Sequence, residues 1–176
     1  MIRPDSGRGL PRVIPTVDQL IKTVCDGPWQ TKSGSSLLVA LRLPFTDMLE
    51  YMSADKTELD ALPQDIRGFR ICTNRNMPKG GIGGNEFHRI RKELFVILEG
   101  TLKITSEDLR GNTREEILQS GETFSMLPYI MHSVEALEEG TGFLETASTL
   151  FNVADPRTHD TYPREEFERL KLSLKK

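Results

Sequence analysis

Glutamate and histidine side chains that could do chemistry gather between Gly80 and Gly100. Glu86 and His88 are separated by one residue, so on a strand their side chains point to the same face of a sheet. Glu93 follows after four residues, enough for a bend that returns its carboxylate to the same cavity. The apolar run from Leu94 to Leu98 is typical of a buried strand. The stretch therefore predicts a ligand site built into a β-sandwich.

Two kinds of chemistry fit these residue types, and the first is metal binding. His132 follows Pro128 at a later strand end, where it can join the same cavity. Imidazole nitrogens and carboxylate oxygens suit divalent Mn, Fe, Ni or Zn. The predicted ligands are Glu86, His88, Glu93 and His132. The alternative is that the two carboxylates lie on a wet barrel mouth and that His132 is a hydrogen-bonded rim residue.

The second kind is acid–base catalysis without a metal. A His or Glu in a semi-apolar barrel can have its pKa moved toward neutrality and can then transfer protons. Moving a proton between carbons next to a ketone requires a base, an acid and a donor to the enolate oxygen. The candidate catalytic residues are Glu86, His88, Tyr129 and His132. Tyr129 has an alternative role as a rim aromatic packed on the sheet.

Arginines near this stretch can bind a phosphorylated ligand, because guanidinium pairs bidentately with phosphate. Arg70 and Arg75 are the candidate substrate-binding residues. Strand alternation places Arg89 and Arg91 opposite His88, so we expect both to face away from the cavity. Each of the four has the alternative role of a solvated strand residue.

The composition is that of an ordinary soluble domain, with 28% charged and 37% hydrophobic residues in a chain of 176. A net charge of -3 and scattered basic residues argue against nucleic acid or an anionic membrane as a partner. No apolar run has membrane-spanning length, and the N-terminus lacks the apolar core of a signal peptide. Cys25 and Cys72 lie far apart, which suits a reducing cytoplasm. We therefore expect a cytoplasmic protein with a small-molecule ligand.

The first third of the chain predicts an arm followed by mixed elements. Residues 1–15 are rich in proline and arginine and predict an irregular arm. Residues 16–25 predict a short helix, because apolar residues recur at helical spacing and Thr16 with Gln19 forms a capping box. Residues 26–36 predict a loop, and residues 36–43 and 66–73 predict strands.

Many short strands follow. Beyond Leu94–Leu98, the predicted strands are Thr101–Thr105, Glu115–Leu118, Thr123–Leu127, Ser133–Leu137 and Gly142–Thr149, with a hairpin loop over residues 107–113. Pro163 then begins a helix over Arg164–Leu172, with acidic residues first and lysines last, as the helix dipole favours. Short strands joined by turns predict a jelly roll.

The site stretch also resembles the first motif of the cupin superfamily. Gly80, Glu86, His88, Glu93 and Gly100 reproduce its spacing, with Glu86 at the position of the family's first His. The segment from Gly121 to His132 resembles the second motif, with Ile130 in place of a glycine. The resemblance implies an all-β, cupin-type jelly-roll sandwich or barrel. With the elements above, we expect an N-terminal arm and short helix over residues 1–30 and a barrel with a C-terminal helix over residues 31–176.

Further segments resemble the cupins of sugar-nucleotide biosynthesis, which include the dTDP-6-deoxyhexose 3,4-ketoisomerases. These are residues 26–43, 70–84 and 147–167, and Gly84 to His88 is similar to the Gly-x-His-x-His segment of that group. The resemblance implies a metal-free barrel, a dTDP- or UDP-linked keto-sugar and a homodimer. The arm and the exposed strand edges of a jelly roll also favour a homodimer.

The favoured function is therefore acid–base isomerisation or epimerisation of a nucleotide-linked keto-sugar. The alternatives are a non-catalytic cupin that binds a small molecule, and a metal-dependent cupin oxygenase or isomerase.

Overall fold

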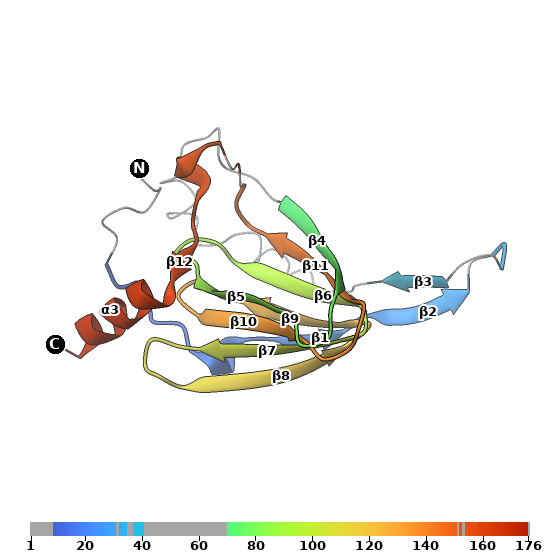
Figure 1. Ribbon diagram of the computed structural model, residues 1–176, viewed down its shortest axis with the longest axis horizontal. Helices are drawn as coiled ribbons and strands as arrows, with labels where there is room; N and C mark the ends of the chain where they lie inside the picture. The colour runs from blue at the N-terminus through green and yellow to red at the C-terminus, as the bar shows by residue number, and fades with distance from the viewer. Residues whose placement is uncertain are drawn as a thin grey trace.

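The computed structural model describes residues 9–30, 32–34, 37–40, 70–150, 152 and 154–175, and all structural statements below refer to these. Two five-stranded antiparallel sheets face each other, and a helix at the C-terminal end packs beside one of them (Figure 1). The predicted all-β jelly roll with a C-terminal helix is confirmed.

The first sheet has the order β1–β9–β6–β11–β4. Its strands are β1 (Lys22–Val24), β9 (Glu122–Met126), β6 (Glu93–Glu99), β11 (Thr141–Ala147) and β4 (Arg70–Met77). The second sheet has the order β12–β5–β10–β7–β8. Its strands are β12 (Tyr162–Pro163), β5 (Ile82–Phe87), β10 (Met131–Ala136), β7 (Thr101–Glu107) and β8 (Thr113–Gln119). A separate hairpin joins β2 (Asp26–Gln30) and β3 (Leu37–Ala40).

The core lies between the two sheets. In β7, Leu102 and Ile104 are fully buried and alternate with partly exposed residues, as expected of a strand with one face on a core. On the opposite sheet, Phe95 and Phe124 are cross-strand partners, and both are buried. The apolar run and the short segments between turn signals predicted the strands from residue 94 to residue 149 to within a few residues.

A second apolar cluster fastens the C-terminal segment to the end of β5. Helix α3 (Arg164–Leu174) begins directly after Pro163, as predicted. The Phe87 ring lies 5.3 Å from that of Tyr162 and 5.4 Å from that of Phe167, centroid to centroid. Because Phe87 is the last residue of β5, this packing holds the chain that precedes α3 against the segment that follows β5.

The predicted helix over residues 16–25 is wrong. Only Val17–Gln19 forms one 3₁₀ turn, in which the Gln19 side chain accepts a hydrogen bond from the backbone N–H of Thr16 at 2.9 Å. Residues Lys22–Val24 instead pair with β9 as strand β1. Val17 and Leu20 still reach the core, so their burial explains the apolar spacing, and pairing with the open edge of β9 overrides the helical propensity.

The predicted loop over residues 26–36 is wrong for Asp26–Gln30, which forms strand β2 and pairs with β3, whereas residues 32–34 form a turn. The strand predicted over residues 36–43 is present as Leu37–Ala40. The strand predicted over residues 66–73 is present from Arg70 and runs on to Met77, and residues 66–69 lie outside the described part, as does the start of the predicted arm, residues 1–8. Neither Cys25 nor Cys72 forms a disulfide bond within the described ranges. Within the described ranges, no helix is long and apolar enough to cross a membrane.

Candidate active site

Strand pairing brings Glu86 and His132 together. The two residues are direct partners across β5 and β10, so their side chains lie on the same face of the second sheet. The register shifts next to this pair, and Gly84 and Asn85 take φ values of 77° and 65°. A side chain at Gly84 would lie 3.1 Å from the carbonyl oxygen of His132, so the irregularity requires glycine.

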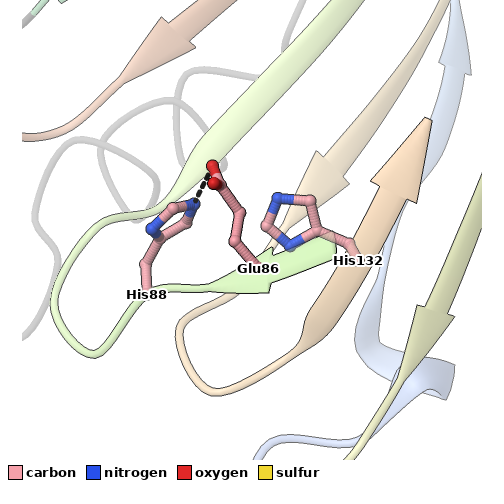
Figure 2. Close-up of side chains that lie close together, drawn as sticks. All are labelled: Glu86, His88 and His132. Atoms are coloured by element: carbon pink, nitrogen blue, oxygen red, sulfur yellow. Dashed lines mark ion pairs between the residues drawn. The ribbon is translucent and has the colours of Figure 1, made fainter. Parts of the chain in front are cut away.

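Alternation along β5 brings His88 to the same site. Phe87 points to the cluster under α3, whereas Glu86 and His88 point to the opposite side, where His132 lies (Figure 2). Nε2 of His88 lies 3.8 Å from Oε1 of Glu86. The ring centroids of His88 and His132 are 5.2 Å apart. The predicted convergence of these three side chains is therefore what the structure shows.

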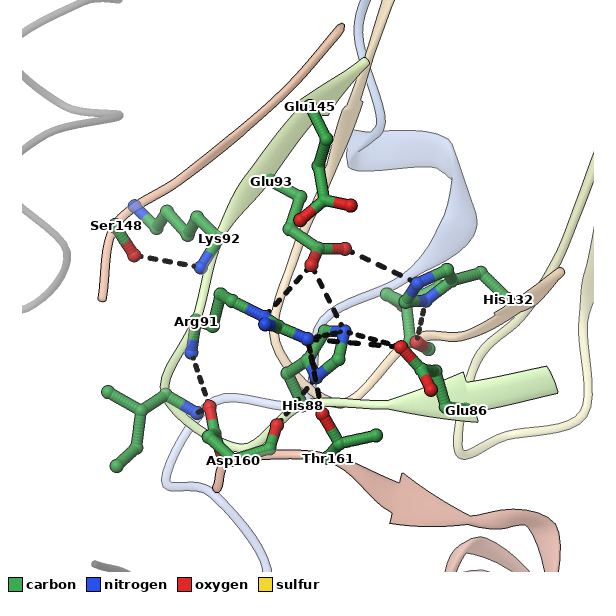
Figure 3. A network of polar contacts seen from close by, with 12 residues as sticks. Glu86, His88, Arg91, Lys92, Glu93, His132, Glu145, Ser148, Asp160 and Thr161 are labelled. Carbon is green, nitrogen blue, oxygen red and sulfur yellow. Dashed lines mark hydrogen bonds and ion pairs between the residues drawn. The ribbon is translucent and has the colours of Figure 1, made fainter. Parts of the chain in front are cut away.

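Asp160 holds the bend that follows His88. Its buried carboxylate accepts hydrogen bonds from the backbone N–H groups of Arg89, Ile90 and Arg91, at 3.0, 2.9 and 2.8 Å (Figure 3). Sequence reasoning missed Asp160, although it lies in the segment 147–167, because nothing in that segment points to a contact with a bend about 70 residues earlier in the chain. Only the packing of β12 on β5 brings it here.

Both histidines are fixed in the same way. Nδ1 of His88 lies 2.6 Å from the carbonyl oxygen of Asp160, and Nδ1 of His132 lies 3.0 Å from that of Ile130. A carbonyl oxygen only accepts, so the carbonyl contacts favour the tautomer with the proton on Nδ1, and Nε2 of His88 then accepts from Nη2 of Arg91 at 2.8 Å. This leaves Nε2 of each ring facing Glu93, at 3.2 Å from Oε1 for His88 and at 3.3 Å from Oε2 for His132.

Glu93 is thus a buried carboxylate shared by two imidazoles, and the guanidinium of Arg91 is a third neighbour. Nε of Arg91 lies 2.8 Å from Oε1 of Glu93. Burial by itself would raise the pKa of Glu93, but the positive charges of His88 and Arg91 and hydrogen bonds from both histidines hold that pKa well below 4.5. Glu93 is therefore a permanent anion at the centre of the site.

His132 is the complementary cation. Burial would lower its pKa, but the contact with Glu93 and the hydrogen bond to the Ile130 carbonyl raise the pKa above 6.5. The pKa of Glu145, on the neighbouring strand β11, is raised as well. Burial and the negative charge of Glu93 raise the pKa of Glu145, and its ion pair with Arg70, at 3.0 Å, counteracts part of that rise.

Exposure separates Glu86 from the rest of the site. The side chains of His88, Arg91, Glu93 and His132 are between 1% and 6% exposed, whereas that of Glu86 is 34% exposed. Glu86 is therefore the member of the cluster that an arriving ligand meets first. It occupies the position at which the cupin first motif has a histidine.

The prediction that Arg91 faces away from the cavity is wrong. Nη2 of Arg91 lies 2.8 Å from both ring nitrogens of His88 and 3.9 Å from Oε1 of Glu86. Strand alternation does not apply here, because β5 ends at Phe87 and the Asp160 bend redirects the chain. Arg89 does face away, toward Glu166 of α3 at 2.5 Å and over the Tyr162 ring.

The two candidate phosphate-binding arginines lie at opposite ends of β4. Arg70 pairs in register with Ala147, which also pairs with Glu93, so Arg70 is level with the site, two strands away. Arg75 lies five residues further along and is exposed, about 17 Å from Arg70 at the usual rise of a strand. Arg70 is thus the arginine of β4 at the site's end of the barrel.

Tyr129 lies in the apolar cluster under α3. Its ring centroid is 6.2 Å from that of Phe87, and its hydroxyl donates to the carbonyl oxygen of Gly9 at 3.4 Å. Its backbone takes the left-handed conformation, with a φ of 60°. This placement supports the packing role for Tyr129 and gives the turn before His132 its shape.

The donor atoms of Glu86, His88 and His132 lie within 4.8 Å of one another, a spacing that a metal ion could bridge. Two imidazoles and a carboxylate also suit a borderline divalent ion. In this arrangement, however, the guanidinium of Arg91 already lies against His88 and Glu93. The residues as placed therefore fit one guanidinium, and they do not fit a metal ion beside it.

The ion pair of His132 and Glu93 should give the stability of the fold a maximum in pH. Glu93, with its lowered pKa, stabilises the fold above pH 4.5, and this contribution is lost as the pH falls through its folded pKa. His132, with its raised pKa, stabilises the fold below pH 6.5, and this contribution is lost as the pH rises through its folded pKa. The pair therefore contributes most between pH 4.5 and 6.5.

Urea unfolding at a series of pH values checks this prediction. We expect the free energy of unfolding to fall above pH 6.5 by about 1.4 kcal/mol for each unit by which the folded pKa of His132 is raised. The Glu145 carboxyl, whose pKa is also raised, contributes a separate decline, so Glu145→Gln is the control that should keep the His132 slope. A His132→Gln variant with the same slope above pH 6.5 as the wild type would contradict the assignment.

The sequence and the structure of this chain were compared with those of known proteins. No protein-family model matches the chain, and no curated protein matches its sequence. Solved structures do match. A 3,4-ketoisomerase from Helicobacter canadensis is 16% identical, with a TM-score of 0.60 over 88% of this chain and 98% of that one.

Two further matches come from Thermoanaerobacterium thermosaccharolyticum. The sugar 3,4-ketoisomerase QdtA in complex with TDP is 14% identical, with a TM-score of 0.59 over 89% of this chain and 98% of that one. A histidine-to-asparagine mutant of the same enzyme, in complex with TDP-4-keto-6-deoxyglucose, is 15% identical, with a TM-score of 0.54 over 87% and 94%. At identities this low, the structural similarity shows the fold alone. The chain is a cupin-type jelly roll with the fold of these sugar 3,4-ketoisomerases.

Proposed function

We propose that this protein isomerises a nucleotide-linked keto-sugar by acid–base chemistry at Glu86 and His88. The observation that carries the proposal is the pairing of a half-exposed carboxylate with a buried imidazole whose Nδ1 proton is fixed by Asp160. Such a pair provides one group that can reach a ligand and one that can supply or collect its proton. The fold, shared with enzymes that act on TDP-linked sugars, supports the choice of substrate class.

Glu86 is the base in this proposal. Its carboxylate takes the proton from the hydroxyl-bearing carbon next to the ketone, and the electron pair forms an enediolate. The proton returns to the former carbonyl carbon, while the hydroxyl proton moves to the other oxygen, so the ketone changes position. The two carbons exchange oxidation states, and no other reactant is consumed.

His88 and the charged side chains in contact with it stabilise the enediolate in this proposal. Nη2 of Arg91, 2.8 Å from Nε2 of His88 and 3.9 Å from Oε1 of Glu86, is the cationic N–H group that can donate to a developing oxyanion. The anion of Glu93 raises the pKa of His132, which burial would otherwise lower. Arg70, level with the site, is the proposed contact for a phosphate of the nucleotide.

The second candidate function is a non-catalytic cupin that only binds a small molecule. The observation that favours it is the burial of His88, which is 1% exposed and would need ligand-induced opening to touch a sugar directly. A binding protein with Glu86 at its mouth would need no such movement.

A ligand screen followed by exchange in deuterium oxide tests both functions. We expect TDP-4-keto-6-deoxyglucose, TDP or UDP to raise the thermal unfolding midpoint, since a ligand that binds only the folded state stabilises it. In deuterium oxide, NMR should then show solvent deuterium entering the sugar carbons together with the isomerised ketone. A raised midpoint without deuterium or product would support the binding protein instead. If no nucleotide sugar changes the midpoint, the proposed substrate class is wrong.

A further inference from the structure

The guanidinium of Arg91 lies among the donor atoms of the candidate metal triad. We propose that Arg91 is a built-in cation that takes the place of a metal ion in this barrel. Replacing it by a neutral side chain should open a divalent-metal site at Glu86, His88 and His132. The proposal is independent of the sugar substrate, because it concerns only which cation the site holds.

The first argument is position. Arg91 reaches three of the surrounding side chains, with Nε 2.8 Å from Glu93, Nη2 2.8 Å from the His88 ring nitrogens and Nη2 3.9 Å from Glu86 (Figure 3). A metal ion bonded to Nε2 of His88 at about 2.1 Å would therefore lie within about 5 Å of that guanidinium nitrogen. The two cations would share one set of donors.

The second argument is charge. The Arg91 side chain is 6% exposed, and a guanidinium stays protonated in proteins. Two cations this close repel strongly in a buried site, where the effective dielectric constant is low. The carboxylate of Glu93 is compensated by Arg91 and the histidines, so it has little charge left to attract a dication.

The third argument is that Arg91 cannot easily move aside. Its backbone N–H donates to the buried carboxylate of Asp160 at 2.8 Å, and Nη2 also donates to Oγ1 of Thr161 at 3.3 Å. The main chain at Arg91 is therefore held by the same bend that places His88. Metal binding would have to break these contacts as well as overcome the repulsion.

Zinc titration by calorimetry, on protein freed of metal with a chelator, tests the proposal. The neutral variants are Arg91→Met and Arg91→Gln, and Arg91→Lys keeps the charge. Arg89→Met is the matched control, because Arg89 is equally buried in the same bend but faces Glu166 on α3. Thermal unfolding of each variant confirms that it is folded.

We expect both neutral variants to bind one Zn²⁺ with a dissociation constant at least 100-fold lower than that of the wild type, Arg89→Met or Arg91→Lys. Adding His132→Ala to Arg91→Met should remove that binding, because it removes a ligand of the triad. Stoichiometric zinc binding by the wild type, as tight as by Arg91→Met, would overturn the proposal. So would a folded Arg91→Met or Arg91→Gln that binds zinc no more tightly than the wild type. If neither neutral variant folds, the wild-type titration is the test: stoichiometric zinc binding would overturn the proposal, and the absence of zinc binding would support it.

Discussion

Replacing Glu86 by Gln is expected to lower the turnover of a keto-sugar by about 10²- to 10⁴-fold, the usual contribution of a general base. Gln keeps the size and hydrogen-bonding reach of Glu but cannot accept the proton. Glu86 is half-buried and its contacts with His88 and Arg91 are long, so the fold should tolerate the change. Turnover and KM would be measured by NMR on TDP-4-keto-6-deoxyglucose.

The control for this prediction is Glu99→Gln, at the exposed C-terminal end of β6. It removes one carboxylate without touching the site, so turnover should be unchanged. The rise in unfolding midpoint on adding the nucleotide sugar should persist in Glu86→Gln, since binding does not require the proton transfer. Turnover within threefold of the wild type in Glu86→Gln would show that another group takes the proton.

Replacing Asp160 by Ala is expected to cost about 3 kcal/mol or more of unfolding free energy. The change leaves the buried N–H groups of Arg89, Ile90 and Arg91 without their acceptor, and each such group costs about 1–3 kcal/mol. The bend after β5 should loosen, and His88 and Arg91 would lose their fixed positions. Urea unfolding gives the free energy.

Asp160→Asn should be milder, because its amide keeps one oxygen that can accept from two of the three N–H groups. The matched control is Asp18→Ala, at an exposed aspartate, which should change the unfolding free energy by less than about 0.5 kcal/mol. A loss of less than 1 kcal/mol in Asp160→Ala would mean that the bend is held by its other packing. The buried backbone hydrogen bonds would then not be what fixes the site.

The jelly roll and the central residues of the site could both be predicted from the amino-acid sequence. A strand with one buried face leaves a period of two, as in β7, and this signal survives without knowledge of the partner strands. The same period placed Glu86 and His88 on one face, and the motif spacing added Glu93 and His132. All four converge in the structure.

The sequence did not determine elements whose conformation depends on a distant edge. Lys22–Val24 carries helical spacing but becomes β1, because the edge of β9 offers backbone hydrogen bonds that an isolated helix could not match. Asp26–Gln30 looks like a loop but pairs as β2 with β3. In both places the conformation depends on a partner strand that the residues of the segment itself do not reveal.

The surroundings of the four site residues depend on contacts between distant segments. Asp160 reaches the bend because Phe87, Tyr162 and Phe167 pack together, and nothing near Asp160 in the sequence indicates that contact. The bend in turn brings Arg91 onto His88 and Glu93, where alternation along β5 would have turned it away. Spacing along a strand fixes which side chains share a face, because the backbone geometry is local. The position of the Arg91 charge in the buried cluster depends on the packing of two segments that lie about 70 residues apart in the chain. Local backbone geometry therefore does not predict it.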